Sequence, residues 1–386
     1  MGDIERMKEI IDYIITWLCY GDEEAAQRVA YTADEKALET HDVIIVPNGH
    51  LGKELVVPEL KRPIVEEPTK GKTIIRTDIV YATFFFTSRA EEILNPQRDE
   101  HGRFLAKYSV LGQRSRIQIP RLDEYARLVL KQLNLPLPES GFSHIYLTHD
   151  IDSISQYRSL RGCIGGLLRG EKKDVWAAIK DIHNDPLYTF PWLLEQDSKV
   201  KHAETIYFVK RTHGKGYDYP QYCLHGRDFR QLKHMLRRHN VYMGVHGSYY
   251  GSIPPIQYSR MYRAHYLRCS IEQLQRLADA GYTDDFTMGF ADQAGFRLQT
   301  CRAVRWINPI TYALTPLTLH PLLVMDNTLS QANYMNLSEE EALFCCERLI
   351  DKVRMHHGEL CLLWHNSNIN NTCYHRSLYE KVINCI

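Results

Sequence analysis

The chain has 386 residues and a mass of 45.1 kDa, which is enough for two domains or for one large barrel with an extension. Hydrophobic residues make up 44% and charged residues 24% of it, which excludes a disordered chain, a collagen-like repeat and a disulfide-rich miniprotein. Basic and acidic residues both number 47, so the chain as a whole lacks the basic excess of a generic nucleic-acid or anionic-membrane binder.

The sequence contains no segment suited to crossing a membrane. The best apolar stretch, residues 10–19, has about half the length a span needs and contains Asp12. Residues 1–9 carry charges of both signs and lack a small-residue cleavage site, so we expect neither a signal peptide nor an anchor. The ten cysteines include no CxxC pair, which predicts reduced thiols and a cytoplasmic protein.

The first third of the chain predicts a small α/β unit. Apolar residues at helical spacing predict a helix over 4–20, and short apolar runs predict strands at 43–46, 55–57, 73–76 and 82–86. Residues 54–72 are predicted to be mostly loop, and 121–133 a helix. The segment Leu135-Pro-Leu-Pro-Glu-Ser-Gly141 stops that helix and reads as a linker. We therefore predict an accessory α/β domain over residues 1–140, with its own core, and a second domain over 141–386.

After this boundary, predicted strands alternate with predicted helices. Strands are expected at 144–148, 203–209, 241–245, 283–290 and 360–364, and helices at 228–238, 270–280 and 338–356. Ser270 with Gln273 and Ser338 with Glu341 have capping-box spacing. This alternation predicts parallel strands joined by crossover helices.

Three of these strands run directly into polar residues that can bind metals. They are followed by His149-Asp150-Ile151-Asp152, by His246-Gly247-Ser248-Tyr249 and by His365-Asn366-Ser367. The carboxyl ends of parallel strands open onto one face, where active sites lie, so these segments are expected to converge. The alternative for any one segment is an ordinary polar turn.

Asp150 and Asp152 are two residues apart, so in an extended stretch they share a face while His149 points the other way. Two adjacent ionised carboxylates repel unless a cation or a shared proton relieves them. One solution divides the work, with one carboxylate binding a divalent metal and the other acting as a general base on water. The structural alternative is turn and cap formation by Asp-x-Asp-Ser.

A catalytic zinc site needs about three protein ligands and one open position. Asp152 and His246 supply two, His265 is our first choice for the third, and His365 competes with it. His365 also suits the general acid that an amide hydrolase needs for its leaving amine.

Arginines are mostly solvated or paired at the surface, so Arg263, Arg268 and Arg297 each need a specific reason to be assigned to a site. Arg297 has one because it follows Asp292 in the irregular loop Phe290-Ala-Asp-Gln-Ala-Gly-Phe-Arg297.

In this order, the segments from about Phe142 to Ile386 resemble the NodB-like polysaccharide deacetylase family, carbohydrate esterases with a distorted (β/α) barrel. The resemblance is to a divergent bacterial branch and rests on four motifs. These are Thr148 to Asp152, His246 to Tyr249, Arg263 to Arg268 and Gly295 to Arg297. The upstream Phe84 to Glu92 and Asp99 to Phe104 resemble the N-terminal domain that accompanies this branch.

The resemblance implies that Asp150 is the catalytic base, Asp152 and His246 are metal ligands, His365 is the general acid and Arg263 orients the base. The family's second metal histidine would stand where Tyr250 is, and its usual proline where His265 is. Either His265 replaces the missing ligand or the site has lost its metal.

From these expectations we predict a metal-dependent hydrolase that removes the N-acetyl (or O-acetyl) group of a sugar or polysaccharide. The expected metal is a divalent ion, with zinc as the first choice. Asp150, His365, Arg263 and Arg297 would be catalytic, and Asp152, His246 and His265 would bind the metal. The alternatives are a carbohydrate-binding protein without activity on the same scaffold, and a hydrolase of another small amide.

Overall fold

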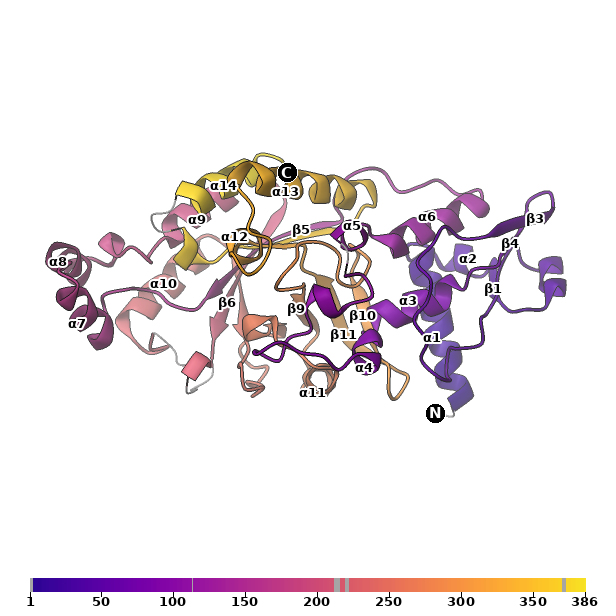
Figure 1. The fold of residues 1–386 in the computed structure, drawn as a ribbon, viewed down its shortest axis with the longest axis horizontal. Coiled ribbons are helices and arrows are strands. Elements are labelled where there is room, and N and C mark those ends of the chain that lie inside the picture. Colours follow the sequence, from indigo (N-terminus) through magenta and orange to yellow (C-terminus); the bar gives the residue numbers. More distant parts are fainter. Residues whose placement is uncertain (1–2, 113, 212–215, 219–221, 370–372) are drawn as a thin grey trace.

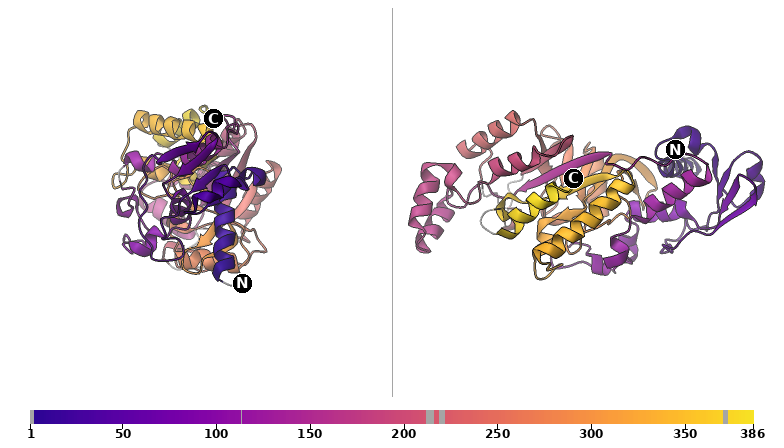
Figure 2. Two further views of the ribbon diagram at one scale, coloured as in Figure 1. Left: turned by 90° about the vertical axis from the view of Figure 1, so that its right-hand side faces the viewer. Right: turned by 90° about the horizontal axis from the view of Figure 1, so that it is seen from above.

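The computed structural model describes residues 3–112, 114–211, 216–218, 222–369 and 373–386. The molecule is elongated, with a four-stranded sheet at one end and a curled nine-stranded sheet in the middle (Figure 1). Seen from above in Figure 2, a pair of helices projects at the end opposite the small sheet. No helix in the described ranges is long and apolar enough to span a bilayer.

The N-terminal part surrounds the small sheet, in which β1, β2 and β4 are parallel and β3 is antiparallel, in the order β1-β2-β4-β3. Its strands are β1 (Val29–Tyr31), β2 (Val43–Ile45), β3 (Val65–Thr69) and β4 (Lys72–Ile75). Its helices are α1 (Asp3–Leu18), α2 (Glu23–Ala26), α3 (Ile79–Thr87), α4 (Glu91–Leu94), α5 (Arg114–Ile117) and α6 (Arg121–Gln132). The predictions of α1, β2, β4 and α6 are confirmed.

The strand predicted at residues 82–86 is wrong, because this segment lies inside α3. The Asp78 carboxylate caps this helix by accepting a hydrogen bond from the backbone N–H of Tyr81 at 2.8 Å. All nine residues of α3 are buried, so no polar face reveals its helical period.

The strand predicted at residues 55–57 is also absent from the described structure. Its backbone is satisfied by a side chain instead: the Tyr81 hydroxyl accepts from Val56 N at 2.8 Å and donates to Val56 O at 2.7 Å. The predicted loop over 54–72 contains β3, which is exposed throughout and so carries no apolar signal.

The large sheet has the order β10-β11-β9-β8-β7-β6-β5-β13-β12, with every neighbouring pair parallel except β10 and β11. Its strands are β5 (His144–Ile151), β6 (Ala203–Lys210), β7 (Tyr242–His246), β8 (Met261–Arg263), β9 (Asp284–Met288), β10 (Val304–Asn308), β11 (Ala313–Pro321), β12 (Val324–Met325) and β13 (Glu359–Leu363). The five predicted strands of this region are confirmed, whereas β8, β10, β11 and β12 were not predicted.

Helices lie between several of these strands and after the last one. They are α7 (Leu160–Leu168), α8 (Lys172–Lys180), α9 (Phe190–Asp197), α10 (Arg227–Arg238), α11 (Ile271–Asp279), α12 (Asp326–Ser330), α13 (Glu339–Met355) and α14 (Cys373–Ile383). Both predicted N-caps are confirmed: the hydroxyls of Ser270 and Ser338 accept hydrogen bonds from the backbone N–H groups of Gln273 and Glu341, three residues further on.

The fold is therefore mixed α/β with a strongly curled sheet. The chain after β11 runs across to β13, where Leu323 N–H donates to Cys361 O at 3.0 Å. Among the described strands β10 and β12 remain the two edges, so the expected distorted barrel appears as a curled open sheet rather than a fully closed one.

The chain passes from the small sheet to the large one near residue 140. However, the expectation that the two parts have separate cores is wrong. One apolar cluster contains Ile14 and Phe84 from the N-terminal part together with Trp306 and Leu317 from the large sheet. The small sheet is therefore packed onto the large one, and the boundary at 140/141 separates sheets without separating cores.

Candidate functional site

The strand ends predicted to converge do meet, at one cavity of about 600 Å³. Strands β5, β6 and β7 are parallel neighbours, and β13 lies on the other side of β5. Side chains at or just after their carboxyl ends form one wall of the cavity. The predicted site residues among its lining are Asp150, Asp152, His246, His265 and His365.

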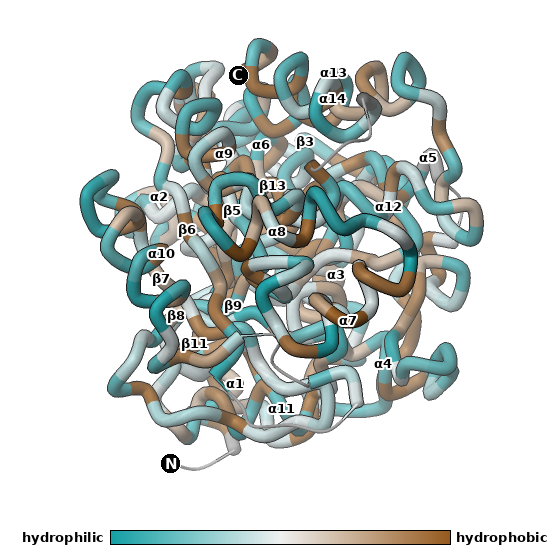
Figure 3. Tube along the Cα trace, turned by 90° about the vertical axis from the view of Figure 1, so that its left-hand side faces the viewer, coloured by the Kyte–Doolittle hydropathy of each residue, from teal (hydrophilic) through white to brown (hydrophobic). Residues whose placement is uncertain are grey.

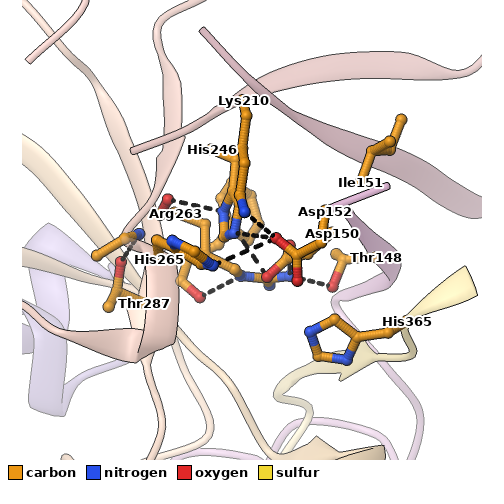
Figure 4. A network of polar contacts seen from close by, with 12 residues as sticks. Thr148, Asp150, Ile151, Asp152, Lys210, His246, Arg263, His265, Thr287 and His365 are labelled. Atoms are coloured by element: carbon orange, nitrogen blue, oxygen red, sulfur yellow. Dashed lines mark hydrogen bonds and ion pairs between the residues drawn. The ribbon is translucent and has the colours of Figure 1, made fainter. Parts of the chain in front are cut away.

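The two aspartates point into the cavity and the residues that alternate with them point away. Figure 4 shows Asp150 and Asp152 directed toward the histidine rings, with Ile151 on the opposite face. His149 is buried elsewhere: its Nδ1 lies 2.8 Å from the Trp364 carbonyl and its Nε2 lies 3.0 Å from Asp197. The strand period therefore places His149 in a packing role, as expected.

Asp150 is held by a buried arginine. Arg263 Nη1 donates to Asp150 Oδ1 at 3.2 Å and to Thr148 Oγ1 at 2.7 Å, while its Nε donates to the Phe286 carbonyl at 3.0 Å. The guanidinium also lies over the Phe208 ring. Arg263 is fully buried, so it fixes the carboxylate and balances its charge at the same time.

His246 presents one ring nitrogen to the cavity. Its Nδ1 lies 3.2 Å from the Arg263 carbonyl oxygen and donates to it, which leaves the lone pair on Nε2. This Nε2 is buried and has no hydrogen-bond partner among the described residues. Burial lowers the pKa of His246 below its ordinary value, so the ring stays neutral at pH 7.

His265 is oriented in the same way by a carboxylate. Its Nδ1 donates to Asp218 Oδ1 at 3.2 Å, and its Nε2 lies 3.3 Å from Asp152 Oδ1. A carboxylate that accepts from the outer nitrogen of a histidine is the usual support of a metal-binding imidazole. The next two residues, Tyr266 and Leu267, both have positive φ (61° and 55°), a costly turn that holds His265 in the cavity wall.

Asp152, His246 and His265 together form a donor set suited to a divalent metal. One ligand atom from each lies within 4.8 Å of the others. Because both histidines use Nδ1 as a donor, their Nε2 lone pairs face the Asp152 carboxylate, an arrangement that needs a cation or a proton between them. Two imidazoles and one carboxylate match the ligand number and type of a catalytic zinc site.

Lys210, the last residue of β6, places its ammonium group beside the Asp152 carboxylate of this donor set. Its Nζ lies 2.8 Å from Asp152 Oδ1, and the side chain is buried. Burial opposes ionisation of Asp152, but its contacts with His246, His265 and Lys210 hold the pKa of this carboxyl well below its usual range. The lysine therefore already supplies part of the positive charge that the donor set requires.

His365 lies across the carboxylates from His265 (Figure 4). Its Nδ1 donates to Asp326 Oδ1 at 2.8 Å, and Asp326 Oδ2 accepts from the backbone N–H of His365 at 2.8 Å. Burial lowers the pKa of His365, but the buried Asp326 carboxylate more than offsets this and raises it to about 9. The ring is therefore protonated at pH 7 and can donate a proton into the cavity.

The structure does not bring Arg297 to this cavity. Its Nη2 donates to Glu92 Oε1 at 2.7 Å and its Nη1 to the Gly289 carbonyl at 2.9 Å, in a buried cluster that also contains Arg89. The irregular loop that suggested a site role instead ties α4 to the large sheet. The expectation that Arg297 is catalytic is corrected accordingly.

Several residues around the cavity were not predicted. Asp218, Asp326 and Lys210 contact the histidines and Asp152. Of these three, only Lys210 has a visible sequence signal, since it directly follows the predicted strand 203–209. The N-terminal part also reaches the cavity with His101 and Arg103. The His101 ring lies 4.9 Å from that of Tyr266, and Tyr217 packs against Tyr266 at 5.3 Å, so aromatic rings flank the opening.

Comparisons with known proteins give little beyond this geometry. Residues 5–138 match a family model described as a family of unknown function (DUF7033). No curated protein matches the chain. A crystal structure from Mycobacterium smegmatis described as a "putative polysaccharide deacetylase" is similar over 65% of this chain and 86% of its own, with a TM-score of 0.42 and 14% identity. A likeness of that size does not establish a shared fold.

Proposed function

We propose that the protein is a metal-dependent hydrolase that removes an acetyl group from a sugar, by cleaving an N-acetyl amide or an O-acetyl ester. One arrangement carries this proposal. The donor set Asp152, His246 and His265 lies in the same cavity as a second carboxylate fixed by an arginine and a protonated histidine fixed by an aspartate. A base, an acid and a Lewis-acid site in one cavity are what acyl hydrolysis requires.

The residues divide the reaction between them. A divalent metal held by the donor set would polarise the acyl carbonyl and make a water molecule more acidic. Asp150 would accept the proton of the attacking water, and Arg263 would hold the Asp150 carboxylate in position through its hydrogen bond. His365 would donate its Nε2 proton to the departing amine or alcohol, while Asp326 stabilises the imidazolium.

A sugar suits the rest of the cavity. Polar groups dominate its lining, and the Tyr217 and Tyr266 rings stand at its edge. Sugar rings bind by hydrogen bonds from their hydroxyls and by contact with aromatic faces. The resemblance of the four sequence motifs to polysaccharide deacetylases favours the same substrate class.

One observation favours a second candidate, a carbohydrate-binding protein without activity. Lys210 Nζ lies 2.8 Å from Asp152 Oδ1 and so supplies a positive charge where the metal would bind. If the lysine is the permanent counterion of Asp152, no metal binds there. The cavity then keeps its shape but has no hydrolytic activity.

Acetate release from N-acetylated oligosaccharides tests the proposal. We expect the parent protein, purified without chelator, to release acetate, and Asp150→Asn to lose about 10²–10⁴ in turnover. Asp279→Asn, on the exposed face of α11, is the matched control and should behave as the parent. A parent protein that binds these oligosaccharides but releases no acetate with zinc, manganese or cobalt present would favour the binding protein.

A further inference from the structure

The helices α7 and α8 form a hairpin that projects from the end of the molecule (Figure 1). They lie between β5 and β6 in the chain and pack around one small apolar cluster. That cluster consists of Tyr157, Val175 and Ala178, with Cys163 and Leu167 packed against it. Most of the hairpin surface is therefore not covered by the other residues that the structure describes.

One face of α7 is apolar and exposed. Leu160, Ile164 and Leu168 are 80%, 49% and 83% exposed. They are spaced four residues apart, so they form a continuous stripe along one side of the helix. Figure 3, which views the molecule from this end, shows α7 and α8 in front.

The exposed face of α8 has an aromatic residue among lysines. Trp176 is 64% exposed, and Lys172 and Lys180 lie one turn before it and one turn after it, with Lys173 beside them. From residue 160 to 180 the chain has five basic and two acidic residues, whereas the whole chain is balanced. Glu171 pairs with Arg169 at 2.9 Å, which leaves four basic residues and one acidic residue, the same excess of three positive charges.

We propose that the α7–α8 hairpin docks onto the surface of an anionic lipid bilayer. Leucine, isoleucine and tryptophan on a protruding helical face, next to lysine and arginine, are suited to the boundary between headgroups and acyl chains. Anionic headgroups complement the local basic charge. A protruding tip of this kind reaches a flat, deformable surface more readily than it fills a pocket of a folded partner.

The docking would place the candidate cavity next to the membrane. Arg161, the second residue of α7, lines that cavity as well as flanking the apolar stripe. When the hairpin is bound to the membrane, the cavity would therefore lie close to saccharides attached to the headgroup layer. The docking itself does not depend on the proposed activity, because none of the metal-binding or acid-base residues belongs to the hairpin.

Vesicle flotation with the full chain tests the proposal. We expect binding to phosphatidylcholine vesicles that contain a quarter of phosphatidylglycerol, weakening with salt, and little binding to phosphatidylcholine alone. Leu168→Ser should lower the partition about tenfold, and Lys172→Gln and Lys173→Gln about fivefold each. Ile310→Ser removes another exposed apolar side chain (67% exposed, against 83% for Leu168) on the β10–β11 turn and should change nothing.

Trp176 gives a second readout. Trp17, Trp306 and Trp364 are buried, and the half-buried Trp192 packs against Tyr379 on α14, outside the hairpin. The emission that shifts to shorter wavelength on docking should therefore come mainly from Trp176, and the shift should disappear in Trp176→Phe. All substituted side chains are exposed, so unchanged circular dichroism will show that the variants fold. The proposal is overturned if the parent ignores anionic vesicles at low salt, or if Leu168→Ser binds as well as Ile310→Ser. It is also overturned if light scattering shows a dimer that Leu168→Ser dissociates while vesicles have no effect.

Discussion

Asp152 is the residue on which the whole site depends, because two imidazoles and one ammonium group face its carboxylate. His246 and His265 approach from β7 and from the loop after β8, and Lys210 from β6. In a site that binds a metal, the lysine and the ion compete for the same carboxylate oxygen. The lysine then tunes affinity without being a ligand.

Replacing Lys210 should therefore strengthen metal binding. We expect Lys210→Met to raise zinc affinity about tenfold, because a buried positive charge beside the ligand set is removed while its volume is kept. Competition with a chromogenic chelator measures this. Lys131→Met, on the exposed surface of α6, is the control. Unchanged or weaker zinc binding in Lys210→Met would show that the lysine does not compete with the ion.

Asp326 should set the alkaline limit of activity. It raises the pKa of His365 to about 9, so the general acid is protonated below that pH and activity should fall as the pH rises through it. In Asp326→Asn the carboxylate is lost, the pKa of His365 falls, and the alkaline limb of kcat/KM should move to lower pH. Metal content should stay the same, which separates this effect from damage to the ligands. An alkaline limb that does not move would remove His365 from the acid role.

At the scale of elements, the sequence predicted best where a local signal and tertiary burial agree. The capped helices α11 and α13 and the apolar strands β5, β6 and β7 were predicted because their caps and periods are visible locally. By contrast, α3 is buried on all sides and β3 is exposed on all sides, so neither has a period to detect.

Site residues, too, were predicted where the sequence carries a local signal. The strand period placed Asp150 and Asp152 on one face, and the motif order pointed to His246, His265 and His365. Asp218 and Asp326 come from separate segments and meet the histidines only in three dimensions. No local pattern could link either one to its partner.

His320 connects three strands of the large sheet, and its contribution to stability can be measured. From β11 its Nδ1 lies 2.8 Å from Glu359 on β13, and its Nε2 lies 3.1 Å from Asp284 on β9, while its ring stacks on Phe286. It therefore helps to hold the curled sheet together. Burial lowers its pKa, but the two carboxylates outweigh burial and raise it to about 9.

Because this folded-state pKa lies above the unfolded value of about 6.5, His320 stabilises the fold fully below pH 6.5. The contribution is lost as the pH rises to about 9. It amounts to at most about 3 kcal/mol. Urea unfolding of His320→Gln and the parent between pH 6 and 9 measures it. The gap between the two proteins should narrow with rising pH, and a constant gap would show that the protonated ring is not what stabilises the sheet.

At the scale of the whole molecule, the shared core predicts joint unfolding. Asp123 on α6 is fully buried and accepts hydrogen bonds from Thr300 Oγ1, Cys301 N and Arg302 Nε, each at 2.8 Å. Together with the Glu92–Arg297 pair, these bonds join the N-terminal part to the large sheet.

Asp123→Asn should destabilise the protein by about 3 kcal/mol, because Arg302 loses its buried counterion. The loss should appear as one cooperative transition by both circular dichroism and tryptophan fluorescence. Two separate transitions, with only one shifted, would instead restore the predicted independence of residues 1–140 and 141–386.

The metal content of three proteins tests the central claim most directly. We expect the parent to hold about one equivalent of zinc or a similar ion when purified without chelator. Asp152→Asn should lose it, since the charged ligand is gone. Asp150→Asn should keep it, because Asp150 is held by Arg263 and is the proton acceptor rather than a ligand. A parent protein that takes up no divalent ion even when it is supplied, or equal loss in both variants, would contradict this account.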